Sequence, residues 1–315
     1  MNNINSNCLK LETRKYDNGM FQKSVDSTYI IHLENNGRLQ DINKQLEIFQ
    51  PTNIVYIVFN KGYEKCEKIL PYQTPPYDLV DTFLFIFQDA NEKGYKNILI
   101  LEDDFIFTEK IYTSNHLKNV NDFLNQKKEE KFLYYLGCLL WLQLPYNEHT
   151  SINLMSSGTH SVIYTYSARK YLLEKKLIPI YDWDVYNNLL SGIRRYVYKE
   201  PLCYQLFPIT ENSKHWVTFF NFDLTRIYIN FAHLDVKLEN GYSNTYNFSK
   251  ILGYILIILF LILLFFTGKY LFKILKMKKI MTNTKMNKKK IIEKYILYIT
   301  LFIMFNDNVM TNNNN

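Results

Sequence analysis

The chain has 315 residues, of which 47% are hydrophobic and 21% charged, a composition typical of a folded domain with an appendage rather than of a disordered protein. Its formal net charge is +7, but the positive charge gathers near the carboxyl end, where ten lysines and one acid lie between Lys269 and Lys294. Because the remainder is close to neutral, the composition argues against nucleic acid as a ligand of the folded part.

The first residues, 1–26, are polar and read as a lead-in to the folded domain. Met1–Ser24 contains no apolar core of the kind that a secretory signal peptide requires. The cysteines are far apart and show neither a zinc spacing nor a Cys-x-x-Cys pair, so we expect no disulfide framework and a reducing compartment. They are Cys8, Cys66, Cys138 and Cys203.

Strand and helix patterns then alternate along the chain. Ser27–Leu33 and Asn53–Phe59 are apolar strand candidates, and Arg38–Phe49 between them has its apolar residues at helical spacing. Asp78–Asn91 is a second helix candidate and leads into a third strand, Asn97–Leu101. This alternation predicts an α/β domain over 27–245, with a Rossmann-like, mostly parallel sheet and right-handed crossovers.

An uncharged apolar stretch follows the domain. Ile251–Gly268, extended to Phe272, is long enough to cross a bilayer, although a buried soluble helix has the same composition. We expect a transmembrane helix over 251–272 and a basic tail over 273–315. The tail contains a short apolar segment, 295–305, of interfacial length and ends in an Asn-rich stretch expected to be disordered.

The side of the membrane on which the domain lies is open from the sequence. The lysines that follow the span favour a cytosolic tail, which would place the domain across the membrane. A domain made before the span without a signal peptide would instead stay in the cytosol, and we favour the cytosolic-facing arrangement.

Three consecutive carboxylates, Glu102, Asp103 and Asp104, end the third strand. Ionised groups are costly to bury, so they are expected at the carboxyl end of the sheet, where open α/β sheets bind ligands. A divalent cation would relieve their mutual repulsion, and hard oxygen ligands suit Mn²⁺ or Mg²⁺. We expect Asp104 and Glu102 to be the metal ligands, with a solvated acidic turn as the alternative.

Four motifs in this order resemble family 25 glycosyltransferases, which include lipopolysaccharide and procollagen galactosyl- or glucosyltransferases and have relatives in large DNA viruses. They are Tyr29–Leu33, Asn97–Phe107, Gly158–Leu173 and the Tyr-Asp-Trp-Asp of Tyr181–Asp184. The resemblance covers roughly residues 27–216. It implies a GT-A-like sheet, a nucleotide-sugar donor and Mn²⁺. The family's usual Asp-x-Asp has Glu102 in its first position here.

An inverting transfer needs a general base that takes the proton of the acceptor hydroxyl. Asp182 and Asp184 are the candidates, and Trp183 between them could stack on a sugar ring. The alternative is a polar turn anchored by the tryptophan. His215 could complete the metal shell, although a lone histidine is more often structural.

The donor is expected at the mouth of the first strand. In the architecture that the resemblance implies, His32, Leu33 and Arg38 lie where the nucleobase and diphosphate bind. Asp103 would face the ribose or a structural partner, and Lys214 could meet a phosphate. Surface charges are the alternative for both basic side chains.

The resemblance to family 25 and the apolar stretch over 251–272 together imply a membrane-anchored glycosyltransferase. It would move a hexose, galactose or glucose, from a nucleotide donor such as a UDP-hexose to a hydroxyl of a glycan, lipid or protein. The alternative is a catalytically inactive, membrane-tethered scaffold with the same fold.

Overall fold

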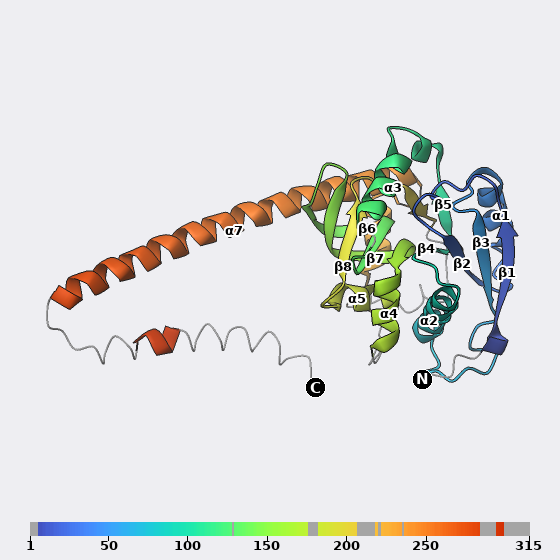
Figure 1. Ribbon diagram of the computed structural model, residues 1–315, viewed down its shortest axis with the longest axis horizontal. Helices are drawn as coiled ribbons and strands as arrows, with labels where there is room; N and C mark the ends of the chain where they lie inside the picture. The colour runs from blue at the N-terminus through green and yellow to red at the C-terminus, as the bar shows by residue number, and fades with distance from the viewer. Residues whose placement is uncertain are drawn as a thin grey trace. The chain divides into compact units, whose positions relative to one another are not determined.

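The structure is a computed structural model that describes residues 6–127, 129–175, 182–206, 218–219, 222–234, 236–283 and 294–298. The chain divides into two compact units, Met1–Ile255 and Leu256–Asn315. The first unit is an α/β domain built on a sheet of seven strands, in the order β1-β3-β2-β4-β7-β6-β8 (Figure 1).

The first half of the sheet has the expected strand–helix alternation. Strand β2 pairs in parallel with β3 on one side and with β4 on the other. The strand and helix patterns of the sequence are thereby confirmed, and their ends shift by a few residues at most. The elements are β2 (Ser27–Leu33), α1 (Leu39–Ile48), β3 (Ile54–Asn60), α2 (Pro75–Glu92) and β4 (Asn97–Glu102).

Both faces of the sheet are buried, which explains why its strands are continuously apolar. Along β2, Ile30 belongs to one hydrophobic cluster and Ile31 to the other, because successive side chains of a strand point to opposite faces. Helices α1 and α3 contribute to the cluster that contains Ile30, whereas α2, α4 and α5 contribute to the other. Helix α3 spans His116–Gln126, α4 spans Tyr166–Glu174 and α5 spans Trp183–Leu189.

The polar lead-in contains a strand. Strand β1 (Leu9–Lys15) follows a short 3-10 helix, η1 (Ser6–Cys8), and pairs antiparallel with β3 at the edge of the sheet. Its sequence is polar because an edge strand alternates buried and exposed side chains and has few apolar residues.

The expectation of no disulfide is wrong for one pair of cysteines. Cys8 and Cys66 form a disulfide across a separation of 58 residues, with their Cα atoms 5.7 Å apart. The antiparallel ladder sets Leu9 opposite Asn60 and so brings the two distant segments together. Cys138 and Cys203 are free and buried, as expected for structural thiols.

The second half of the sheet departs from the parallel pattern, so the sheet is mixed. Strand β7 is antiparallel to both of its neighbours, β4 and β6, whereas β8 is parallel to β6. Five strands therefore run one way, and β1 and β7 run the other way. The three strands of this half are β6 (Phe132–Pro145), β7 (Thr150–Thr165) and β8 (Arg194–Tyr198).

The reversed direction of β7 shapes the edge of the sheet beyond β4. Ser161 of β7 lies opposite Leu101 of β4, so residues 158 and 159, which precede it, pass beyond Glu102, the last residue of β4. Short elements complete the unit near this edge and elsewhere. They are β5 (Phe105–Phe107) paired with β9 (Cys203–Gln205), β10 (Thr218–Phe219) paired with β11 (Phe222–Asp223), η2 (Glu109–Tyr112) and α6 (Leu224–Phe231).

Helix α7 (Leu238–Asn283) begins in the first unit, where its first part packs on β6. The Gln143 side-chain amide donates to the Tyr246 carbonyl oxygen at 2.9 Å and to the Ser249 hydroxyl at 2.7 Å. A Cβ on Gly253 would lie 1.9 Å from the Gln143 carbonyl oxygen, so only glycine allows this close approach.

In the second unit, α7 is strongly apolar from Leu256 to Leu275, and most of the side chains in this range are exposed. Over Leu238–Leu275 the helix is long and apolar enough to cross a membrane, with a mean hydropathy of 2.8 in its most apolar window. This agrees with the expected span. Most of the second apolar segment, 295–305, lies outside the described residues.

Candidate functional site

The three acids lie at the carboxyl end of β4, as expected. Glu102 is the last residue of that strand, and Asp103 and Asp104 form the turn that leads into β5. Asp103 is 8% exposed and Asp104 is 5% exposed, whereas Glu102 is half-buried. A solvated acidic turn does not describe this arrangement, because Asp103 and Asp104 are buried and burial of the Glu102 carboxyl group raises its pKa.

Asp103 is held by the loop that follows β2. Its Oδ2 atom accepts from Asn36 Nδ2 at 2.5 Å and from the Leu33 backbone N–H at 3.3 Å, and it lies 3.2 Å from His32 Nδ1. Arg38 Nη1 donates to Oδ1 at 2.5 Å. Burial raises the pKa of Asp103, but these hydrogen bonds and the Arg38 charge outweigh it, and the pKa falls below its ordinary value. His32, Leu33 and Arg38 thus contact Asp103, and a ribose contact of Asp103 stays a prediction.

Asp104 is oriented by a residue that is distant in sequence. Gln205 Nε2 lies 3.1 Å from one carboxylate oxygen of Asp104 and 3.3 Å from the other. Strands β5 and β9 pair here, and the Leu206 backbone N–H donates to the Asp104 carbonyl oxygen at 3.2 Å. Arg38 Nη1 is 3.8 Å from Oδ2. Burial, and next the charge of the neighbouring carboxylate, raise the pKa of Asp104 to about 6.

Glu102 and Asp184 meet at the part of β7 that passes beyond β4. The Thr159 hydroxyl donates to Glu102 Oε1 at 2.9 Å, and the Gly158 backbone N–H donates to Asp184 Oδ2 at 2.6 Å. Burial, and then the charges of Asp104 and Asp184, raise the pKa of Glu102 above its ordinary value. Burial likewise raises the pKa of Asp184 to about 7. The site therefore concentrates negative charge that its own hydrogen bonds do not balance.

The other residues of the second acidic motif have structural contacts. Asp182 caps the amino end of α5, where its Oδ1 accepts the backbone N–H of Asp184 at 2.8 Å. Trp183 is 2% exposed, and its ring stacks on Phe83 at 4.9 Å between centroids. Stacking of Trp183 on a sugar ring is therefore wrong, and the anchoring alternative holds. The tryptophan fixes α5 to the core and so fixes the position of Asp184.

Two expected site residues cannot be placed. Lys214 and His215 lie outside the described residues. Within the described residues, no three His, Cys, Asp or Glu side chains gather closely enough to hold a metal ion by themselves. Glu102 and Asp104 nevertheless have the donor chemistry of a Mn²⁺ or Mg²⁺ site, since such ions take one or two carboxylates together with phosphate and water oxygens.

Several contacts of this site have no local signal in the sequence. Gln205 lies in an ordinary strand, and Asn36 reads as part of a turn. Gly158 lies within β7, and its φ of +85° favours glycine. His160 is fully buried, with Nε2 3.4 Å from the Cys203 carbonyl oxygen, and burial lowers its pKa to about 4. It is therefore a neutral side chain of the interior.

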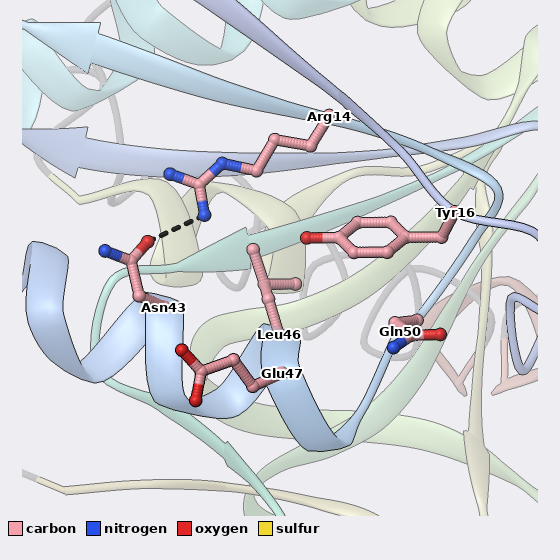
Figure 2. Close-up of a pocket in the computed structure, with 6 residues that line it drawn as sticks. All are labelled: Arg14, Tyr16, Asn43, Leu46, Glu47 and Gln50. Carbon is pink, nitrogen blue, oxygen red and sulfur yellow. Dashed lines mark hydrogen bonds between the residues drawn. The ribbon is translucent and has the colours of Figure 1, made fainter.

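A surface hollow of about 260 Å³ lies elsewhere on the first unit, beside β1 and α1 (Figure 2). Arg14 Nη1 donates to Asn43 Oδ1 at 2.6 Å across it. It shares no residue with the carboxylate cluster, so we do not assign the chemistry to it. Its lining residues are Arg14, Tyr16, Asn43, Leu46, Glu47 and Gln50.

No protein-family model matches the chain, and no curated protein sequence matches it. Among solved structures, it is similar to A197 from STIV, with a TM-score of 0.34, 14% identity, and coverage of 59% of this chain and 86% of that one. It is also similar to a glycosyltransferase involved in the glycosylation of the major capsid of PBCV-1, with a TM-score of 0.35, 11% identity, and coverage of 59% and 94%. A putative glucose-1-phosphate thymidylyltransferase from Bacillus anthracis gives a TM-score of 0.25, 14% identity, and coverage of 53% and 66%.

Proposed function

We propose that the protein is a glycosyltransferase of the family 25 type with a GT-A-like domain. It transfers a hexose, galactose or glucose, from a nucleotide-diphosphate sugar such as a UDP-hexose to a hydroxyl of a glycan, lipid or protein. The observation that carries the proposal is the convergence of Glu102, Asp104 and Asp184 at the carboxyl end of β4, with the pKa of each raised by burial.

The metal-binding role is proposed for Glu102 and Asp104. Their burial and mutual repulsion make the ionised forms unfavourable, and a bound cation would reverse that penalty. When bound there, Mn²⁺ or Mg²⁺ would act as a Lewis acid that stabilises the charge on the departing diphosphate. The Gln205 amide holds both oxygens of Asp104 and so fixes the orientation of that carboxylate. His215 stays a proposed third ligand.

Asp184 is the proposed general base, and the transfer is proposed to be inverting. A base works best when its pKa lies near the working pH, and the pKa of Asp184 is raised to about 7. The Gly158 N–H donates to Oδ2 of Asp184 and so orients this carboxylate. Asp182 is a less suitable base because it already accepts the backbone N–H groups of α5.

The loop after β2 is proposed to bind the nucleotide-sugar donor in a conformation that exists before the donor binds. Asp103 ties His32, Leu33 and Arg38 to the end of β4, so the loop is ordered before any ligand arrives. The Arg38 side chain is 18% exposed and lies between two carboxylates, where its charge can face a diphosphate. Lys214 stays a proposed phosphate contact.

The test is a titration of UDP-glucose and UDP-galactose into the purified full-length protein, with Mn²⁺ and with EDTA. We expect affinity that depends on Mn²⁺, and turnover that is abolished in Asp104→Ala while the protein stays folded. Full activity of that variant would refute the metal assignment. Donor binding that is equal with and without Mn²⁺, or is absent in both, would favour the inactive scaffold.

We also propose that the domain is anchored to a membrane by α7. The helix is long and apolar enough to cross a bilayer, and most of its side chains from Leu256 to Leu275 are exposed. Extraction of membranes from expressing cells with alkaline carbonate tests this, because a transmembrane protein stays in the pellet. Release of the full-length protein into the supernatant would contradict it.

A further inference from the structure

The disulfide of the first unit bears on where this unit folds. Cys8 is 1% exposed and lies directly before β1, and Cys66 lies in the loop after β3. Besides the Leu9–Asn60 pairing, the Lys61 backbone N–H donates to the Cys8 carbonyl oxygen at 3.1 Å. The ladder of the folded sheet therefore brings the two thiols together, and the disulfide belongs to the native fold.

Disulfides form and persist in oxidising compartments, whereas the cytosol keeps thiols reduced. The other cysteines do not point to redox chemistry of their own. Cys138 and Cys203 are fully buried, and burial raises the pKa of each thiol to about 12, which keeps both unreactive. The Cys8–Cys66 disulfide is thus a structural bond, and the two free cysteines offer no reactive thiol to exchange with it.

A second and independent observation concerns the charges around the apolar stretch. The twenty residues before Ile251, residues 231–250, contain two lysines and two acids, whereas residues 269–294 contain ten lysines and one acid. Positively charged segments next to a span stay on the cytosolic side. The charge asymmetry therefore favours a cytosolic position for the carboxyl-terminal tail.

We propose that the α/β unit faces the oxidising, non-cytosolic side of the membrane and that the lysine-rich tail is cytosolic. This reverses the cytosolic-facing arrangement favoured from the sequence. The disulfide and the charge asymmetry lead to the same side, although one comes from the sheet and the other from the tail. The proposal does not depend on the catalytic assignment, and it directs the search for the acceptor to hydroxyl groups on that side.

The test counts free thiols in the full-length protein made in eukaryotic cells. Cells are lysed in denaturant with a polyethylene-glycol maleimide, with or without prior reduction, and adducts are counted by gel shift. Of the four cysteines we expect two to react without reduction and all four after it. Cys8→Ser should give three adducts without reduction, and the matched control Cys138→Ser should give one.

Protease protection in sealed microsomes completes the test. We expect an amino-terminal epitope to be protected and a carboxyl-terminal epitope to be digested, with both digested after detergent is added. Four reactive thiols in the unreduced wild-type protein would overturn the proposal. Digestion of the amino-terminal unit in sealed microsomes would overturn it too, even if the disulfide were present. Both readouts use the wild-type chain, so neither depends on the folding of a variant.

Discussion

Replacing Asp104 by asparagine should make the metal-free protein more stable at neutral pH. Asp104 is 5% exposed, and its pKa is raised from 3.8 to about 6. One unit of pKa shift corresponds to about 1.4 kcal/mol, so ionised Asp104 lowers the free energy of unfolding by about 3 kcal/mol above pH 6. Asparagine keeps an oxygen for Gln205 and carries no charge, so Asp104→Asn should recover up to that amount.

The pH dependence follows from the direction of the shift. Because the folded pKa lies above the unfolded one, the protonated carboxyl favours the folded state, and wild-type stability falls as the pH rises from about 4 to 6. The advantage of Asp104→Asn should therefore be full above pH 6 and absent below about pH 4. Mn²⁺ should raise the stability of the wild type and leave that of the variant unchanged.

The free energy of unfolding of both proteins is measured by urea titration at pH 3.5, 5 and 7.5. The full-length chains are kept in detergent with EDTA, and unfolding is followed by tryptophan fluorescence. Asp122→Asn on the exposed surface of α3 is the matched control and should change stability by less than about 0.5 kcal/mol. An Asp104→Asn variant that is no more stable than wild type at pH 7.5 would refute the reasoning. So would an advantage that persists at pH 3.5.

Three further predictions concern neighbouring residues. Asp184→Asn should lose turnover and keep donor binding in a titration. Turnover of the wild type should fall about tenfold per pH unit below pH 7, because Asp184 becomes protonated. A flat pH profile would exclude Asp184 as the base. Asp182→Asn should keep most of the turnover and change stability by less than about 1 kcal/mol, since asparagine also caps helices. Gln205→Met should weaken the Mn²⁺ affinity, measured by calorimetry, at least tenfold. The reason is that hydrogen bonds to a charged group contribute about 1.5 to 3 kcal/mol. Unchanged affinity would mean that Gln205 does not position Asp104.

The sequence predicted the parallel half of the sheet well because its signals are local. Apolar runs such as Ser27–Leu33 are buried on both faces, and the first two are each followed by a helix, α1 after β2 and α2 after β3. Strand β1 was not predicted from the sequence, because one of its faces is exposed and its composition resembles that of a loop. The direction of β7 could not be predicted, since a buried strand has the same pattern in either direction.

The candidate site was predicted at the level of residue types and not of contacts. The three acids were correctly predicted at the carboxyl end of β4, because three carboxylates cannot follow an apolar strand into the core. The local pattern could not show that Trp183 turns inward or that Asp182 caps α5, since both depend on how α5 packs. The partnership of Cys8 with Cys66 depends on the β1–β3 ladder, which no spacing of cysteines reveals.

The pairing of β5 with β9 also has a consequence for the order of events during synthesis. Asp104 emerges from the ribosome 101 residues before Gln205, the side chain that will hold it. The parallel core of β2, β3 and β4 can form meanwhile, because its contacts join segments already made. Contacts between distant segments form slowly, so β9 should dock late. Until it does, a nascent chain can have most of its hydrophobic core and still lack the contact that orients Asp104.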